Sequence, residues 1–241
     1  MKVRLLLNTQ KNKNGEKKMD ILTAIKERHS VRRYKERPIE KEKLDILFAE
    51  VEKCNRESGL NIQLVTDEPR AFTGALASYG HFSGVANYIA LIGRKSDMLD
   101  ETAGYYGERL VLLAQMLGLN TCWVALTFSK RKARFEVGKG EKLVCVISLG
   151  YGEYQGKPHK DRPLTEICPC YDSSPDWFKA GVDAAMLAPT AVNQQKFTFS
   201  LSGDTVTASA LKGPCSKIDL GIVKYHFEVG AGKDNFKWAE K

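Results

Sequence analysis

Apolar residues recur at helical spacing in three parts of the first 120 residues. Residues 20–28 are apolar at positions 21, 22 and 25 and begin with Asp20, which predicts a short amphipathic helix ending near residue 28. Residues 40–56 are apolar at 44, 47, 48 and 51, and this spacing predicts a longer amphipathic helix. The run 105–118 is apolar almost throughout and ends at Gly118, a residue type favoured after helices, so it predicts a buried helix.

Shorter apolar runs rich in Ile, Leu and Val predict strands between these helices. They cover residues 60–66, 87–93, 120–126 and 142–150. The last two runs are so uniformly apolar that we expect both strands in the centre of a sheet.

After residue 163 the order of predicted elements begins again. Residues 173–189 predict a helix with Ser174 as N-cap, residues 197–210 a hairpin around Gly203, and residues 217–232 a second buried helix. Gly107 and Gly118 are 11 residues apart, as are Gly221 and Gly232, and a tryptophan follows each pair. This recurrence favours an internal duplication within an α+β fold, a mixed α/β sandwich with helices packed on a sheet.

The composition of the 241 residues, 43% hydrophobic and 27% charged, is that of an ordinary globular protein. No run approaches the roughly 18 apolar residues that a membrane-spanning helix needs, so we expect no membrane partner. Six scattered cysteines fit reduced thiols in the cytoplasm, which is the localisation we predict. Cys168 and Cys170 form the one close pair, and no second set of ligands accompanies them, so we expect no metal site.

The net charge of +8 is concentrated at the N-terminus. Residues 1–18 contain six basic residues and one acidic residue, a balance of 6 − 1 = +5, which leaves 8 − 5 = +3 for residues 19–241. Basic and acidic residues alternate along the predicted helices, as on a solvated surface. We therefore expect no nucleic-acid partner, and we interpret residues 1–18 as a basic extension that is either disordered or not native, with Met19 as the alternative start.

Two polar stretches carry the chemistry. Arg28, Ser30 and Arg32 alternate, so in an extended backbone their side chains face one ligand, and two guanidiniums with a hydroxyl suit a phosphate monoester. The stretch 187–197, LAPTAVNQQKF, ends a predicted helix with more amides than a turn requires. Taken by itself, a stretch like the first is usually a solvated charge run, and one like the second is usually a capping loop.

Four motifs in order resemble the nitroreductase family of FMN-dependent oxidoreductases over residues 20–240. R-x-S-x-R at 28–32 is followed by a buried helix leading to LGLNTCWV and by LVCVISLGYGEYQGKPHKDRPLTEI. LAPTAVNQQKFTF is similar to the family's A-P-S-x-x-N-x-Q-P-W-x-F element. The combination is more specific than any one motif.

The order of these motifs differs from that of ordinary family members, which carry both elements in one subunit and bind flavin between two subunits. Here residues 52–65 lack the A-P-S element, and residues 166–241 lack R-x-S-x-R. The resemblance therefore implies two pseudo-symmetric halves that mimic the family homodimer in one chain, residues 19–165 and a degenerate half at 166–241. It also implies one FMN site per chain, in a monomer for which further dimerisation stays open.

The same resemblance implies roles for individual residues. Arg28 and Ser30 would hold the phosphate and ribityl end of FMN with His29 alongside, and Arg32 would lie near the pyrimidine edge. Basic residues near the end of the first half would close around the phosphate, and the second half would contact the isoalloxazine edge. The basic residues are Lys160 and Arg162. The residues of the second half are Pro189, Thr190, Asn193 and Gln195.

The implied activity is hydride transfer from NAD(P)H to FMN and then to a small-molecule acceptor such as a nitroaromatic or a quinone. The flavin supplies the chemistry, so no catalytic side chain is expected. Residues 123–126 read Trp-Val-Ala-Leu where the family often has a pair of small residues, and Lys196 and Phe197 replace Pro and Trp. The altered 123–126 segment and the degenerate second half keep open an alternative, a flavin-binding carrier or sensor with little turnover.

Overall fold

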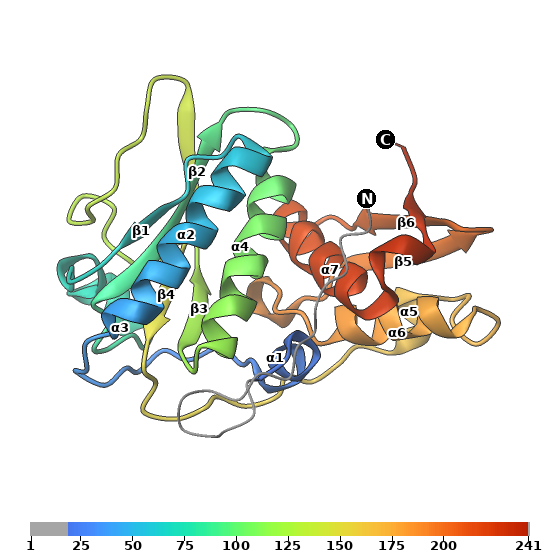
Figure 1. Ribbon diagram of the computed structural model, residues 1–241, viewed down its shortest axis with the longest axis horizontal. Coiled ribbons are helices and arrows are strands. Elements are labelled where there is room, and N and C mark those ends of the chain that lie inside the picture. The colour runs from blue at the N-terminus through green and yellow to red at the C-terminus, as the bar shows by residue number, and fades with distance from the viewer. Residues whose placement is uncertain (1–18, 241) are drawn as a thin grey trace.

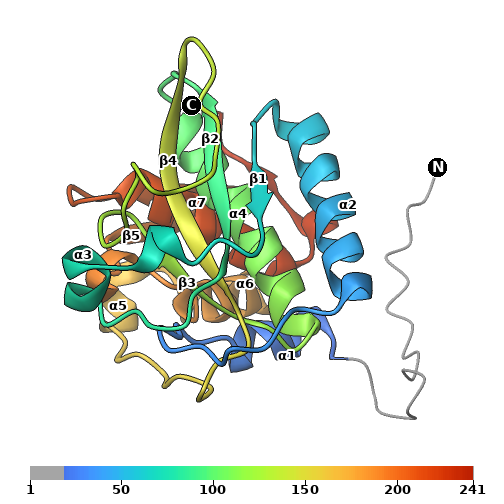
Figure 2. The same cartoon turned by 90° about the vertical axis from the view of Figure 1, so that its left-hand side faces the viewer.

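The computed structural model describes residues 19–240, and the basic extension expected over residues 1–18 lies outside the described residues. Within residues 19–240 the strands form two sheets, and helices α4 (Leu99–Met116) and α7 (Ser216–Ala231) pack against each other between them (Figure 1). The turned view of Figure 2 shows the same central helices behind the larger sheet. The α+β class expected from the sequence is confirmed.

The larger sheet has the strand order β1-β2-β4-β3, and each neighbouring pair is antiparallel. Its strands are β1 (Gln63–Val65), β2 (Asn87–Arg94), β3 (Asn120–Val124) and β4 (Glu141–Gly150). The prediction that β3 is central is wrong, because β3 ends the strand order. Its outer edge is nevertheless covered: Ser30 bridges Thr121, and the Val31 N–H donates to the Thr121 carbonyl over 3.0 Å. This cover explains why an edge strand can be so apolar.

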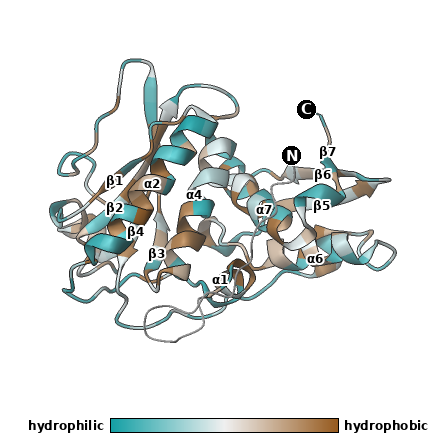
Figure 3. Ribbon diagram, in the orientation of Figure 1, coloured by the Kyte–Doolittle hydropathy of each residue, from teal (hydrophilic) through white to brown (hydrophobic). Residues whose placement is uncertain are grey.

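The helices of the first half follow the predicted apolar spacing. Helix α1 (Ile21–Glu27) begins at Asp20, whose carboxylate accepts from the Thr23 N–H over 2.8 Å. Helix α2 (Lys41–Ser58) buries Leu47, Val51 and Cys54. Figure 3 shows hydrophobic residues concentrated on strands and helices, whereas the connecting loops are largely hydrophilic.

Helix α4 begins at Leu99 rather than at the expected residue 105. Leu99 is buried, and Asp100 and Glu101 lie in the first turn, where carboxylates favour the helix dipole. Gly118 follows the helix with φ +74°, a backbone conformation that glycine adopts without strain. The helix end was therefore predicted correctly and its beginning was not.

The second half consists of α5 (Leu164–Ile167), α6 (Asp176–Met186), β5 (Phe197–Ser202), β6 (Thr205–Ala210), α7 and β7 (Lys237–Trp238). The predicted hairpin is confirmed, with Gly203 at φ +62° between β5 and β6. Ser174 is not the N-cap of α6: Pro175 occupies that position, and the Ser174 hydroxyl donates to the Cys170 carbonyl over 2.7 Å.

The two sheets share part of their topology. Strands β5 and β6 are antiparallel, like β1 and β2. Strand β7 pairs parallel with β6, and β2 and β3 are also parallel to each other because both are antiparallel to β4. Within the described residues the smaller sheet has no strand corresponding to β4, and a cavity of about 460 Å³ is lined by β6 and by Trp238.

Helices α4 and α7 approach each other at two glycines. A Cβ atom on Gly104 would lie 2.1 Å from the Ile218 carbonyl oxygen, and one on Gly221 would lie 2.0 Å from that of Glu101. The contact is reciprocal: Glu101 and Gly104 of α4 correspond to Ile218 and Gly221 of α7, because 218 − 101 and 221 − 104 both equal 117. The sequence spacing had matched Gly221 with Gly107, but Gly107 instead faces Trp123 and Leu91.

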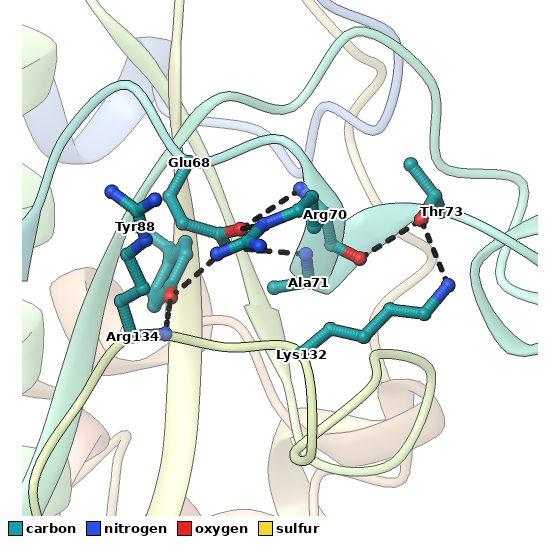
Figure 4. Close-up of polar contacts among 7 residues, drawn as sticks. All are labelled: Glu68, Arg70, Ala71, Thr73, Tyr88, Lys132 and Arg134. Atoms are coloured by element: carbon teal, nitrogen blue, oxygen red, sulfur yellow. Dashed lines mark hydrogen bonds and ion pairs between the residues drawn. The ribbon is translucent and has the colours of Figure 1, made fainter.

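A buried carboxylate holds two loops over the outer face of the larger sheet (Figure 4). Glu68 is 1% exposed and accepts hydrogen bonds from the Arg70 N–H at 3.1 Å and the Ala71 N–H at 3.1 Å. The Tyr88 hydroxyl donates to Glu68 over 3.3 Å and accepts from the Arg134 N–H over 2.7 Å. The loop after β1 and the loop after β3 are thereby joined through Tyr88 of β2.

No helix among residues 19–240 combines the length and the apolar character that crossing a membrane requires.

Candidate functional site

The segment that follows α1 runs in extended backbone beside β3. Arg28 caps α1, its N–H donating to the Ala24 carbonyl over 2.9 Å. Burial raises the pKa of the Cys122 thiol, and Arg32, the Ser30 hydroxyl and Arg28 oppose that rise from close range. All three alternating residues therefore influence the Cys122 thiol.

Arg28 is buried, with 4% of its surface exposed. Burial lowers the pKa of its guanidinium, and the nearby charge of Glu108 opposes this. The Nε atom of Arg28 lies 3.8 Å from Oε1 of Glu108, too far for a hydrogen bond, and it has no hydrogen-bond partner among the described residues. A buried guanidinium donor without an acceptor is costly, so this arrangement suits an anionic ligand.

Glu108 lies in the middle of α4 and is fully buried. Its Oε2 accepts from the Trp123 indole N–H over 2.9 Å, and its Oε1 lies 2.9 Å from Nε2 of His226 on α7. The other ring nitrogen of His226, Nδ1, lies 2.9 Å from the Ala184 carbonyl oxygen of α6. The sequence interpretation missed both Glu108 and His226, although a carboxylate and a histidine within apolar helices were a usable signal.

His29 is partly buried against the loop that follows β4. Burial lowers the pKa of His29, and the charges of Arg28 and His159 lower it further. A Cβ atom on Gly156 would lie 2.5 Å from Cβ of His29, so the loop passes directly across this side chain. Nε2 of His159 lies 3.0 Å from the Met186 carbonyl at the end of α6. His29 and the loop thus connect the basic segment to the second half.

Four of the expected site residues meet in one hydrogen-bonded cluster. The Lys160 carbonyl accepts from Nδ2 of Asn193 over 2.9 Å and from Nε2 of Gln195 over 2.8 Å. The Arg162 N–H donates to Oε1 of Gln195 over 3.0 Å, and the Arg162 guanidinium donates to the Gln195 carbonyl over 3.2 Å. The Arg162 guanidinium also pairs with Glu166.

This cluster changes the geometry expected for the two carboxamides. Gln195 is 1% exposed, and its side chain binds Lys160, Arg162 and Asn193. Both amides therefore hold the Lys160–Arg162 loop in place. Lys160 is exposed and keeps its ammonium group at the surface.

The remaining residues of LAPTAVNQQKF are fixed to α7 and to one another. The Thr190 hydroxyl accepts from the Gln195 N–H over 3.0 Å. Asp219 of α7 accepts from the Ala191 N–H over 3.0 Å and from Nε2 of Gln194 over 2.7 Å. Burial raises the pKa of Asp219 to about 6, and these two hydrogen bonds oppose the rise. Pro189, half-buried, precedes this segment.

The same segment has a strained backbone. Val192, Asn193 and Gln195 have φ values of +47°, +54° and +45°. Positive φ is disfavoured for any side chain and most of all for a β-branched one such as Val192, which is 89% exposed. Strain of this kind persists only where surrounding contacts enforce it, and it is typical of binding sites.

Within residues 19–240 no group of three or more His, Cys, Asp and Glu side chains is arranged to hold a metal ion.

Residues 20–231 match a family model described as "Putative TM nitroreductase". No curated protein matches the chain in sequence. Among solved structures, a Thermotoga maritima protein described as a putative nitroreductase is similar with a TM-score of 0.67 and 23% identity, over 94% of this chain and 91% of that one. This similarity shows the fold.

Two further structures align with a smaller part of the chain. An FMN-dependent nitroreductase from Clostridium difficile is 24% identical over 57% of this chain and 91% of its own, with a TM-score of 0.44. A protein from Desulfovibrio desulfuricans, described as a putative nitroreductase in complex with FMN, is 21% identical over 61% of this chain and 93% of its own, with a TM-score of 0.48.

Proposed function

Since the chain belongs to the nitroreductase family whose model it matches over residues 20–231, we propose that it is an FMN-dependent NAD(P)H oxidoreductase. The observation that supports FMN most strongly is Arg28, a buried guanidinium whose Nε has no hydrogen-bond partner among the described residues. A phosphate would supply a negative charge beside this buried guanidinium. The donor set of the site therefore fits FMN.

In this proposal the first half binds the phosphate end of the cofactor. Arg28 and the Ser30 hydroxyl hold the phosphate and ribityl chain, with His29 beside them. Arg32 is exposed and places its charge near the pyrimidine edge, where a cation favours the reduced, anionic flavin. Lys160 adds its charge near the phosphate, whereas Arg162 contributes less because Glu166 already pairs with its guanidinium.

The second half forms the other side of the proposed site. Pro189 and Thr190 lie against the flavin edge, and the strained backbone that follows keeps them there. Asn193 and Gln195 act through the Lys160–Arg162 loop, whose backbone they hold. This role replaces the direct hydrogen bonds to the isoalloxazine that the resemblance implied.

We also propose that the chain is a fused pseudo-dimer with one FMN site. The reciprocal contact of Gly104 and Gly221 supports this, because residues on a two-fold axis contact in such pairs. The shared strand directions of the two sheets support it as well. A single site follows because the basic segment occurs in the first half and the 189–195 segment in the second.

Bound FMN would accept a hydride from NAD(P)H and pass electrons to a small-molecule acceptor, such as a nitroaromatic or a quinone. The protein then needs to bind and orient the cofactor and to stabilise its negative charge. Neither a nucleophile nor an acid–base pair is required of the protein. We propose a soluble cytoplasmic monomer as the working form.

A flavin carrier with little turnover is the second candidate. Residues 123–126 favour it, because Leu126 is bulky and 79% exposed where the family often has small residues. Stopped-flow mixing with NADH and NADPH separates the two candidates. Rapid bleaching of the flavin absorbance supports the enzyme, and a flavin that stays oxidised supports the carrier.

The absorbance spectrum of the purified protein, with and without added FMN, tests the proposed site. We expect flavin bands in the wild type and their loss in the Arg28→Ala/Arg32→Ala variant. Arg33→Ala is the matched control, because Arg33 is exposed, pairs with Glu153 and alternates to the opposite side of the segment. Equal flavin content in all three proteins would refute the assignment.

A further inference from the structure

Arg28, Glu108 and His226 form a buried charged trio at the centre of the molecule. Their exposed fractions are 4%, 0% and 0%. They come from the segment after α1, from α4 and from α7, so the trio contains residues of both halves. The net charge of the trio determines whether the positive charge of Arg28 is neutralised inside the protein or remains available to a ligand.

The hydrogen bonds of His226 fix the number of protons in the trio. The Ala184 carbonyl can only accept, so Nδ1 of His226, 2.9 Å away, must carry a proton. Nε2 of His226 and Oε1 of Glu108 are also 2.9 Å apart, and that hydrogen bond needs a proton on one of the two atoms. The pair is therefore either imidazolium with carboxylate or neutral imidazole with carboxylic acid.

Both forms of the Glu108–His226 pair have a net charge of zero. Glu108 is the acidic neighbour of Arg28, at 3.8 Å, but its charge is already balanced by the proton that it shares with His226. The Cys122 thiol does not supply a negative charge either, because burial raises its pKa. The trio as a whole consequently carries one positive charge, that of Arg28.

We infer that His226 is a positioning residue for the cofactor phosphate. By sharing its proton with Glu108, it prevents Glu108 from acting as the full counter-ion of Arg28 and leaves the guanidinium for the phosphate. This inference rests on the proposed function, in which that phosphate belongs to FMN. Because Glu108 lies on α4 and His226 on α7, the affinity for the cofactor then depends on the packing of α7 against α4.

Three variants separate this charge effect from a merely structural role. In His226→Gln, the neutral amide can still donate to Glu108, but the pair becomes negative and Glu108 neutralises Arg28. We expect the affinity for FMN to fall by about tenfold or more, since one negative charge is added 3.8 Å from the Nε atom of Arg28 and offsets its positive charge. In Glu108→Gln the pair stays neutral, because the amide donates to a neutral His226, and we expect an affinity within about threefold of the wild type, which is under 1 kcal/mol.

The double variant Glu108→Gln/His226→Gln provides the decisive comparison. Its pair is again neutral, so we expect the second substitution to restore most of the affinity that His226→Gln removes. A structural role for the two residues predicts the opposite, an affinity as low as or lower than that of His226→Gln. Quenching of FMN fluorescence on titration with the apoprotein measures all four affinities, and thermal unfolding of the apoproteins identifies any variant that does not fold.

The possible outcomes distinguish the inference from the proposed function. If the wild type binds FMN and His226→Gln binds equally well, the inference is wrong. It is also wrong if Glu108→Gln alone loses tenfold or more in affinity, and this holds even where His226→Gln does not fold. A wild type that does not bind FMN at all would instead refute the proposed function, and with it the ligand named here.

Discussion

Helices α4 and α7 cross so closely at Gly221 that a methyl group there has no space. A Cβ atom on Gly221 would lie 2.0 Å from the Glu101 carbonyl oxygen and 2.6 Å from the Tyr105 nitrogen. Both are backbone atoms within α4 and cannot rotate away as a side chain can. Gly221→Ala therefore forces the two helices apart by about 1 Å or more before ordinary contact distances are reached.

The expected cost follows from two opposing effects. Overpacking a well-packed contact costs about 1–3 kcal/mol, and a rigid backbone neighbour places this site near the upper value. Alanine is favoured over glycine inside a helix by about 1 kcal/mol, which offsets part of the cost. We expect the free energy of unfolding to fall by about 2 kcal/mol, and Gly104→Ala, the reciprocal partner, to behave in the same way.

Urea unfolding of the apoprotein, followed by circular dichroism, measures these effects. The double variant Gly104→Ala/Gly221→Ala should lose less than the sum of the single losses, because helices that have already separated accept the second methyl group more easily. Lys53→Ala, on the exposed side of α2, is the control and should change stability by no more than about 0.5 kcal/mol. Unchanged or increased stability in Gly221→Ala would refute the close contact of α4 and α7.

Three further predictions concern single residues. The pKa of Asp219 rises from 3.8 to about 6 on folding. Between these pH values the folded state binds a proton that the unfolded state has lost. The free energy of unfolding therefore falls as the pH rises through about 6, by up to roughly 3 kcal/mol. Urea titrations from pH 4 to pH 7 should show this fall in the wild type and not in Asp219→Asn. Glu68→Ala removes the buried acceptor of the Tyr88 hydroxyl and should lower the unfolding free energy by about 3 kcal/mol in the same assay. A loss below about 1 kcal/mol would show that the carboxylate is dispensable. Gln195→Ala should increase hydrogen exchange around Lys160 while leaving exchange in β4 unchanged, and equal exchange in both proteins would show that the amide does not hold that loop.

Much of the fold was predictable because it depends on local patterns. Apolar spacing gave α1, α2 and α7 to within a few residues, and the glycine between β5 and β6 identified their hairpin. The alternation of Arg28, Ser30 and Arg32 was also a local signal, since extended backbone places every second side chain on one face. All three residues influence the Cys122 thiol, and their common ligand stays a prediction.

Features that depend on distant contacts were missed. The edge position of β3 could not be inferred from its apolar sequence, because the residues that cover its edge come from another part of the chain. Glu108 and His226 are 118 residues apart, and neither side chain indicates by itself that it binds the other. Asn193 and Gln195 were predicted as site residues, but nothing in the sequence indicates that the Lys160 carbonyl is their acceptor.

In the proposed function, one chain forms one FMN site from two unlike halves. The most direct measurement is the number of FMN molecules bound per chain, from the flavin absorbance of protein saturated with FMN and freed of excess cofactor, with the protein concentration determined by amino-acid analysis. We expect one FMN per chain. Two FMN per chain would contradict the single shared site, and none would contradict the proposed function itself.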